Sequence, residues 1–221
     1  MRYDQFTYLW PPRPDKAIPD NMLHFYEKRG WVAQMKKNGT NTVLFVSPEK
    51  EIITKTRHND DHKAWKQNDS KALDVFKTLP GDGWYVINCE LLHNKTALVK
   101  DTLFIFDIMV ADGELLVGST FLERQEILKN LFGIRDEGNV VSLSDTSHYV
   151  INSNVWLAKT IEGNFKQIMR IANQQKPVEG APVDEGVVLK NPKARLEMPG
   201  RQKSNSSWQV KCRVAHKNYN F

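Results

Sequence analysis

Short apolar runs, separated by polar or glycine-containing turns, recur along most of the chain. Many of them are rich in β-branched and aromatic residues, which favour extended strands. The two strongest strand candidates are WYVINCELL at 84–92 and DTLFIFDIMVA at 101–111. Shorter runs of the same kind predict further strands at 31–36, 42–47, 51–57, 185–190 and 207–215.

The polar segments between these runs predict how the strands connect. The runs at 31–36 and 42–47 flank KNGTN, so we expect two strands joined by a tight turn. Asp112-Gly113 predicts a second turn after the strand at 101–111. The prolines of WPPRPDKAIP at 10–19 predict an extended, irregular leading segment.

Helices are expected between the strands. Asp20 or Asn21 caps the first, and Gly30 ends it. Thr120 and Glu123 fit a capping box for a later helix. The predicted helices cover about 20–29, 71–78, 121–132 and 154–175, the last with a break at Gly163. The whole pattern is α+β, with antiparallel sheets flanked by helices.

Composition agrees with a soluble globular protein. Of 221 residues, 40% are hydrophobic and 26% are charged, and no apolar run is long enough to cross a bilayer. The N-terminus lacks the apolar core of a signal peptide, and Cys89 and Cys212 have no metal-ligand spacing. We therefore expect a cytoplasmic protein. Its 31 Lys and Arg against 26 Asp and Glu are compatible with binding to nucleic acid or nucleotide phosphates.

Charged residues interrupt strands that are otherwise apolar. They are Glu90 in WYVINCELL, Asp107 in LFIFDIM, Glu185 before GVVLK, and Lys211 and Arg213 in WQVKCRV. A charge on a buried strand needs a partner or solvent, because desolvation otherwise costs stability. We therefore expect one polar cleft shared between two sheets.

Lys36 is the last residue of the strand at 31–36, and Lys37 is the first residue of the turn that follows. Taken alone, Lys36 and Lys37 before Asn38-Gly39 are typical of solvated side chains at the end of a hairpin. Adjacent residues of a strand face opposite sides, so at most one of the two lysines points into a given cleft.

The order of these residues resembles the covalent nucleotidyltransferases, which include ATP-dependent DNA ligases, RNA ligases and mRNA capping enzymes. That family has a nucleophile motif Lys-x-Asp/His/Asn-Gly, then an Arg, a Glu, an aromatic residue, a Glu-Gly and a Lys-x-Lys. The corresponding residues here are Lys36-Lys37-Asn38-Gly39, Arg57, Glu90, Phe106, Glu185-Gly186 and Lys211-Cys212-Arg213, in that order. Together they span nearly the whole chain.

The resemblance implies a fold and a reaction. The fold is an ATP-grasp-like ligase adenylation domain, and the reaction is ATP-dependent joining of a 5′-phosphate to a 3′-hydroxyl through a lysyl-AMP intermediate. Lys36-x-x-Gly39-Thr40-Asn41 is most similar to phage nick-sealing RNA ligases, whereas 106–128 and 181–190 also resemble small viral and bacterial DNA ligases. RNA ligase is slightly favoured, and DNA ligase is the alternative.

The same resemblance implies which residues carry out the chemistry. Lys36 is the expected nucleophile, and neighbouring cations favour the neutral form of a lysine amine. Lys211 and Arg213 would supply such cations and would neutralise the α-phosphate, although the family has Lys where Arg213 stands. Glu185 is the expected ligand of Mg²⁺, with Mn²⁺ as a substitute.

Other residues are expected to bind the nucleotide. Phe106 would stack on adenine, and Glu90 would accept a hydrogen bond from a ribose hydroxyl. Gln34 lies two residues before Lys36, hence on the same side of the strand, and would read the adenine edge. Residues expected to contact ribose, phosphate or the cleft wall are Asn41, Arg57, Lys190 and Lys211.

The partner implied is nucleic acid with a nick or bridged ends. A basic stretch at 190–203 is a candidate for the backbone groove, or else a solvated loop. Only eight residues follow Arg213, so we expect one nucleotidyltransferase domain over 1–221 with no C-terminal OB domain, acting as a monomer. The competing interpretations are a capping-type guanylyltransferase and a non-catalytic nucleic-acid-binding subunit.

Overall fold

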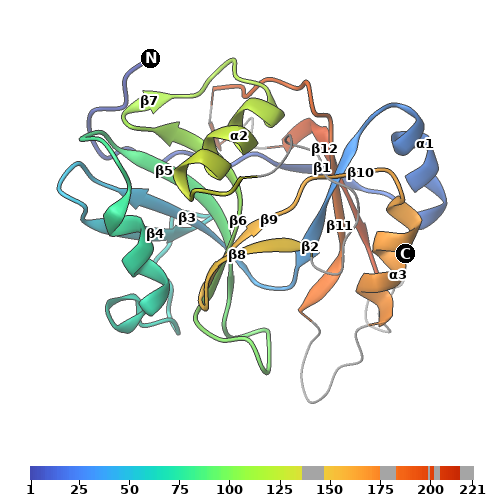
Figure 1. The fold of residues 1–221 in the computed structure, drawn as a ribbon, viewed down its shortest axis with the longest axis horizontal. Helices are drawn as coiled ribbons and strands as arrows, with labels where there is room; N and C mark the ends of the chain where they lie inside the picture. Colours follow the sequence, from blue (N-terminus) through green and yellow to red (C-terminus); the bar gives the residue numbers. More distant parts are fainter. Residues whose placement is uncertain (136–146, 175–182, 199, 202–204, 215–221) are drawn as a thin grey trace.

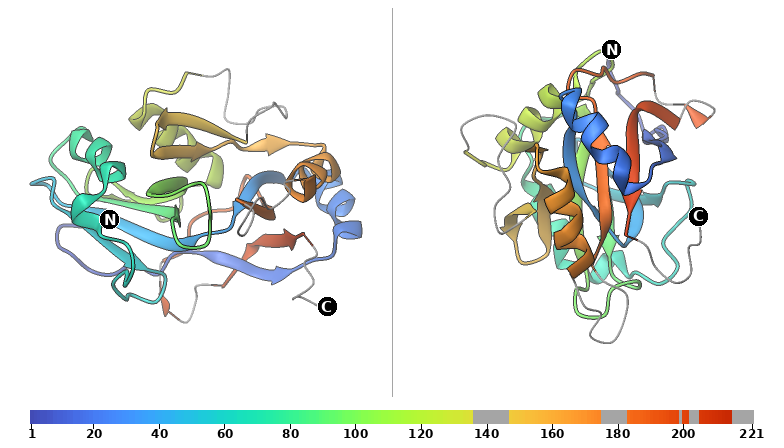
Figure 2. Two further views of the ribbon diagram at one scale, coloured as in Figure 1. Left: turned by 90° about the horizontal axis from the view of Figure 1, so that it is seen from below. Right: turned by 90° about the vertical axis from the view of Figure 1, so that its right-hand side faces the viewer.

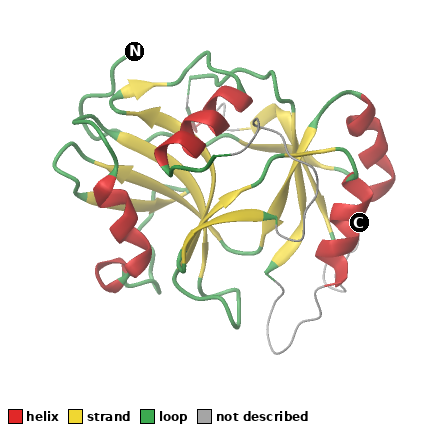
Figure 3. Ribbon diagram, in the orientation of Figure 1, coloured by secondary structure: helices red, strands yellow, loops and turns green. Residues whose placement is uncertain are grey.

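The computed structural model describes residues 1–135, 147–174, 183–198, 200–201 and 205–214. Two sheets form the centre of the molecule, with helices at both ends (Figures 1 and 3). The five-stranded sheet has the order β1 (Arg13–Ala17), β12 (Asn205–Arg213), β11 (Asp184–Lys190), β2 (Val32–Lys37) and β10 (Ile161–Glu162). Within the described residues, no helix is long and apolar enough to span a membrane.

The second sheet has seven strands. Their order is β4 (Ile52–Thr56), β3 (Thr40–Val46), β5 (Tyr85–Leu92), β6 (Thr102–Ala111), β9 (Val155–Ala158) and β8 (His148–Asn152), with β7 (Glu114–Leu115) paired to β6. Most neighbours are antiparallel, but β1 with β12 and β6 with β9 are parallel. The expected α+β class is therefore confirmed, with mixed sheets in place of purely antiparallel ones.

Helices cover the outer face of the five-stranded sheet. α1 (Leu23–Lys28) and α3 (Phe165–Gln174) lie side by side there, as Figures 1 and 2 show. Phe165 and Ile168 of α3 belong to one buried apolar cluster with Ala33 and Met35 of β2. The alternate residues of β2 consequently face the other sheet.

One 3₁₀ helix leads directly into α1. The remaining helices lie beside the seven-stranded sheet. α2 (Phe121–Leu131) has the predicted capping box of Thr120 and Glu123. The 3₁₀ helices are η1 (Asp20–Met22), η2 (Gln67–Asp69) and η3 (Lys71–Thr78). A turn with positive φ at Asp112 and Gly113 joins β6 to β7, also as predicted.

Several predicted elements were wrong. KNGTN does not form a hairpin turn, because β2 pairs with β10 and β11 while β3 pairs with β4 and β5. The segment instead carries the chain from one sheet to the other. Neither Asp20 nor Asn21 provides a side-chain cap. The leading segment, predicted to be irregular, includes a strand, β1, which pairs with β12 with one break in register.

The predicted helix at 154–175 is helical only in its second half. Its first half forms β9 and β10, whose residues Val155, Leu157 and Ile161 are fully or almost fully buried. Gly163 and Asn164 then adopt positive φ, which an α-helix cannot accommodate. The strand β8 had not been predicted.

Candidate functional site

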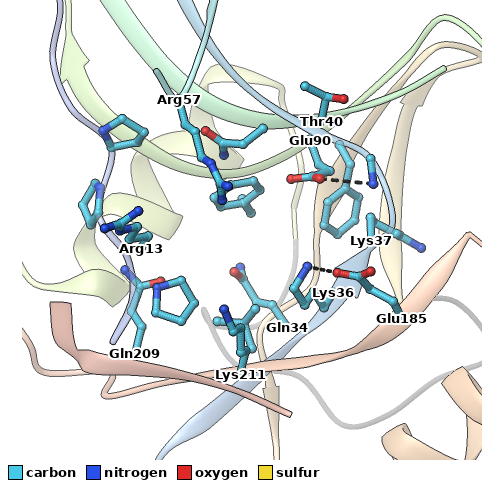
Figure 4. A pocket seen from close by; sticks show the side chains of 18 of the residues that line it. Arg13, Gln34, Lys36, Lys37, Thr40, Arg57, Glu90, Glu185, Gln209 and Lys211 are labelled. Atoms are coloured by element: carbon cyan, nitrogen blue, oxygen red, sulfur yellow. Dashed lines mark hydrogen bonds and ion pairs between the residues drawn. The ribbon is translucent and has the colours of Figure 1, made fainter. Parts of the chain in front are cut away.

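A polar cleft of about 1090 Å³ lies between the two sheets (Figure 4). Its walls come from β1, β2, β11 and β12 of one sheet and from β3, β4, β5 and β6 of the other. The predicted site residues all line it: Gln34, Lys36, Asn41, Arg57, Glu90, Phe106, Glu185, Lys190, Lys211 and Arg213. The expectation of one polar cleft shared by two sheets is therefore confirmed, but Asp107 does not reach it and instead forms a buried ion pair with Arg124.

Strand alternation explains why the five-stranded sheet presents charges to this cleft. On β12, Val210 and Cys212 pack into the apolar cluster under the helices, whereas Lys211 and Arg213 face the cleft. On β11, Val187 and Leu189 pack into that same cluster, and Lys190 faces the cleft. An apolar strand can thus place its cations on the face opposite the apolar cluster.

Glu185 breaks this alternation through a bulge. Asp184 pairs with Lys37 and Gly186 with Lys36, so Glu185 is an extra residue in β11. The bulge turns its carboxylate into the cleft, where it contacts the Lys36 amine and lies 3.7 Å from Arg213 Nε. Gly186 has φ of 134°, and a Cβ there would collide with the carbonyl of Cys212, which explains the Glu-Gly pair.

Lys37 faces away from Lys36, as expected for adjacent strand residues. Its amine forms an ion pair with Asp184 at 2.6 Å, and both side chains are almost fully buried. It also lies 5.1 Å from the centre of the Phe104 ring. Lys36 is the lysine that contacts Glu185 inside the cleft (Figure 4).

The chain crosses between the sheets at Gly39, where it packs tightly on β5. A Cβ on Gly39 would collide with the Leu91 carbonyl. Glu90 accepts a hydrogen bond from the Gly39 amide at 3.1 Å, and the Gly39 carbonyl accepts one from Lys95 at 2.5 Å. Burial raises the pKa of Glu90, and the nearby Lys36 and Lys95 oppose that rise.

Asn41 lines the cleft and has one unpaired amide oxygen. Its Nδ2 donates to Asn88 Oδ1 at 2.9 Å, whereas its Oδ1 is buried without a hydrogen-bond partner within the described residues. A buried acceptor without a donor costs stability, so its presence at the cleft wall calls for an explanation.

A second bulge lies at Phe106. Ile105 pairs with Cys89 and Asp107 with Asn88, so Phe106 is an extra residue in β6. Its carbonyl accepts hydrogen bonds from Gln125 at 3.1 Å and from Lys190 at 3.3 Å. The bulge thus frees a backbone carbonyl for side chains beneath the Phe106 ring.

Gln34 and Lys190 join a buried polar network at the base of the cleft. Lys190 Nζ donates to Gln34 Oε1 at 2.7 Å, and Gln34 Nε2 donates to Gln125 Oε1 at 2.9 Å. Because one amide end accepts and the other donates, the orientation of the Gln34 amide is fixed. Burial lowers the pKa of Lys190 to about 7, with Asp107 opposing and Arg124 adding to the fall.

Lys211 and Arg57 extend the positive charge of the cleft. Burial lowers the pKa of Lys211, and the cations Arg213, Lys36 and Arg57 lower it further, against Glu185. Arg57 is exposed at the end of β4, and its Nε donates to His58 Nε2 at 3.1 Å. These positive groups suit a phosphate-rich ligand.

Solved structures with this architecture identify the fold. A mycobacterial DNA ligase D complexed with ATP and MES matches with a TM-score of 0.61 and 16% identity, over 93% of this chain and 60% of that one. The chain has the fold of an ATP-dependent ligase catalytic domain. An archaeal ATP-dependent RNA ligase matches with a TM-score of 0.50 and 17% identity, over 91% of this chain and 47% of that one.

The ligase fold is recognisable in structure but not by sequence comparison. No protein-family model matches the chain, and no curated protein matches it. The ligase domain of M. tuberculosis LigD shares 15% identity, with a TM-score of 0.60, over 92% of this chain and 60% of that one. The chain therefore spans between about half and two thirds of the length of these ligase structures.

Some residues that line the cleft or lie buried beneath it were missed from sequence. The polar network includes Gln125 of α2 and Thr160, and Arg124 of α2 lies next to it. Lys95 contacts the Gly39 carbonyl. A signal was present in α2, where Phe121, Arg124, Gln125 and Leu128 are buried at the spacing of a core-facing helix stripe. Polar residues in such a stripe indicate buried partners.

Proposed function

We propose that the protein is an ATP-dependent polynucleotide ligase that carries AMP on Lys36. The observation that supports this most strongly is the convergence of every predicted site residue on one cleft, from segments between Gln34 and Arg213. A structural role alone would not gather so many charged residues from four strands and the end of a fifth around open space.

In the first step, the Lys36 amine attacks the α-phosphorus of ATP. A phosphorus–nitrogen bond forms, the bond to the β-phosphate oxygen breaks, and pyrophosphate leaves. Lys211 and Arg213 lie two residues apart on β12, so both face the nucleotide and neutralise charge that develops on the α-phosphate. Arg57 adds a cation from the opposite sheet.

Adenosine would lie against the Phe106 ring, next to the buried network. Phe106 offers its ring to adenine, and Gln34 offers an amide whose orientation Lys190 fixes at 2.7 Å. The unpartnered Oδ1 of Asn41 and the carboxylate of Glu90 suit the hydroxyl donors of ribose. Asn41 pairs with Glu90 across β3 and β5, so the two groups would act on the same sugar.

A divalent metal fits this cleft when it arrives with phosphates. No group of three or more His, Cys, Asp or Glu side chains converges within the described part of the chain. Glu185 and Glu90 nevertheless face the same space, and Mg²⁺ is commonly bound by one or two carboxylates plus phosphate oxygens. Glu185 would hold Mg²⁺ or Mn²⁺, and the ion would supply charge neutralisation at the reacting phosphates.

The second and third steps act on nucleic acid. AMP moves from Lys36 to a 5′-phosphate end, and a 3′-hydroxyl then displaces AMP to form the phosphodiester bond. Both are in-line phosphoryl transfers that depend on positioning. We propose RNA as the preferred 3′ strand, from the Lys36-x-x-Gly39-Thr40-Asn41 pattern, with DNA joining as the second candidate.

The nucleophile is tested by labelling. Incubation with radiolabelled ATP and Mg²⁺ should leave a denaturation-resistant label on the wild type, and mass spectrometry should locate it on residue 36. Lys36→Ala and Lys36→Arg should both lose the label, whereas Lys37→Met should keep most of it. An unlabelled protein, or a label on Lys37, would refute the proposal, and a label from GTP alone would indicate a guanylyltransferase.

The nucleic-acid preference is tested separately. Nicked duplexes with a ribose or deoxyribose 3′ end, and otherwise identical, should be sealed faster when the 3′ nucleotide is ribose. Equal sealing rates would refute the RNA preference and leave the ligase proposal intact.

A further inference from the structure

The first seventeen residues connect the two sheets along one rim of the cleft. At its start this segment bonds to the β6–β7 turn, through Tyr3 N to Gly113 O at 2.8 Å. Tyr8 then donates to the Thr56 carbonyl at 2.8 Å, and residues 13–17 continue as β1 along β12. We call residues 1–17 the N-terminal strap. Its middle, from Trp10 to Asp15, lines the cleft.

Two arginines on or beside the strap, Arg13 and Arg201, have no role in the proposed nucleotide site. Arg13 and Arg201 are exposed, line the cleft and join Arg57 there. Among the ion pairs of the described residues, none involves these three arginines. The acidic residues that line this rim are Asp15 and Asp60, so cations outnumber anions. We call Arg13, Arg57 and Arg201 the cationic rim.

Uncharged and aromatic neighbours hold these arginines in place. Arg13 Nε donates to Asn205 Oδ1 across the β1–β12 pair, and the Arg201 guanidinium lies 5.4 Å from the centre of the Trp10 ring. Trp10 is in turn packed edge-on against Tyr8 at 4.8 Å. Neither arrangement neutralises the positive charge, which remains available to an anion.

The rim extends beyond the reach of a triphosphate. Arg13 pairs with Asn205 and Ala17 pairs with Lys211, so four residues of β1 separate the two positions, which is about 13 Å of strand at ~3.3 Å per residue. In Figure 4, Arg13 and Arg57 lie across the cleft from Lys36 and Glu185. A row of charges of this length matches several successive phosphates of a nucleic-acid strand better than the three of one nucleotide.

We propose that the cationic rim binds the phosphodiester backbone of the strand whose 5′-phosphate receives AMP. In this role Arg13 contacts a phosphate directly, and Trp10 positions Arg201 for another. The inference rests on the proposed ligase function for the identity of the reacting end. Binding of the nicked duplex is nevertheless measured without ATP. A protein that is not labelled on Lys36 and a rim that does not bind nucleic acid are therefore separate results.

The test compares single and double replacements of the rim arginines. Arg13→Ala, Arg201→Ala and the double variant are measured by fluorescence anisotropy on a 5′-phosphorylated nicked duplex across a series of salt concentrations around 0.1 M. Arg170→Ala, which removes an arginine from α3 outside the cleft, is the charge-matched control. Each variant is also assayed for lysyl-AMP formation with ATP.

Each rim arginine should contribute about one unit to the slope of log K against log salt. At 0.1 M salt this corresponds to roughly an eightfold weaker affinity per arginine, while Arg170→Ala changes the slope much less. An unchanged slope in the double variant would overturn the proposal. Equal losses in nick binding and lysyl-AMP formation would also overturn it, because they would place the phosphates of ATP on the rim.

Discussion

Replacing Lys190 with methionine should remove a specific part of the pH dependence of stability. Lys190 is 2% exposed, and its amine contacts Gln34 Oε1 and the Phe106 carbonyl. Burial lowers its pKa to about 7, although Asp107 favours the charged form. Methionine has a similar length and no titrating group, so Lys190→Met isolates the amine.

The sign and size of the Lys190 effect on the free energy of unfolding follow from proton linkage. An unfolded lysine titrates near ~10.4, so between about pH 7 and 10 the unfolded chain binds a proton that the folded Lys190 does not. Stability therefore rises with pH in this window, by at most about 1.4 kcal/mol per pH unit. Between about pH 7 and 10 the titration of this amine raises the free energy of unfolding by roughly 4 kcal/mol. Below about pH 7 its contribution to the free energy of unfolding no longer changes with pH.

Urea unfolding of the wild type and Lys190→Met from about pH 6 to 9.5 measures this difference. The variant should lose a pH-independent ~1–3 kcal/mol, because the Gln34 and Phe106 acceptors lose their donor. Its free energy of unfolding should also rise less steeply with pH than that of the wild type. Lys166→Met, at an exposed position of α3, is the control. A difference between wild type and Lys190→Met that stays constant across the pH range would refute the reasoning.

Three further outcomes are expected. Arg124→Met should lower the free energy of unfolding by about 3–5 kcal/mol in urea melts, because Asp107 is left buried without its partner at 2.8 Å; a loss below about 1 kcal/mol would contradict this. Gly186→Ala should cost at least ~2 kcal/mol and lower Tm by roughly 4–8 °C, since its φ and the Cys212 carbonyl exclude a Cβ; an unchanged Tm would show that the bulge tolerates side chains. Removing Mg²⁺ with EDTA should abolish lysyl-AMP formation, and Mn²⁺ should restore it; labelling that persists in EDTA would refute the metal proposal.

Sequence patterns predicted most of the strands that carry the site, because burial on one face leaves a period of two that is visible in the chain. In β12, Trp208, Val210 and Cys212 alternate with Gln209, Lys211 and Arg213, so the sequence alone separates its apolar face from its polar face. In β11 the consecutive apolar residues 187–189 do not show this period. The network below Phe106 was not predicted, because Gln34 and Gln125 are 91 residues apart and only the packing of α2 on β6 brings them together. Likewise, KNGTN has the composition of a hairpin turn, and only the pairing of β2 with β11 excludes that turn.

The two bulges explain how ordinary strands form this cleft. In a regular β11, Glu185 would share the face of Val187 and Leu189, where α3 would bury its charge in an apolar cluster. One extra residue reverses that orientation and brings the carboxylate to the Lys36 amine. The bulge at Phe106 likewise releases a carbonyl that holds Lys190 beneath the ring. Alternation thus determines which strands can carry charge, and the local breaks in pairing determine which groups meet at Lys36.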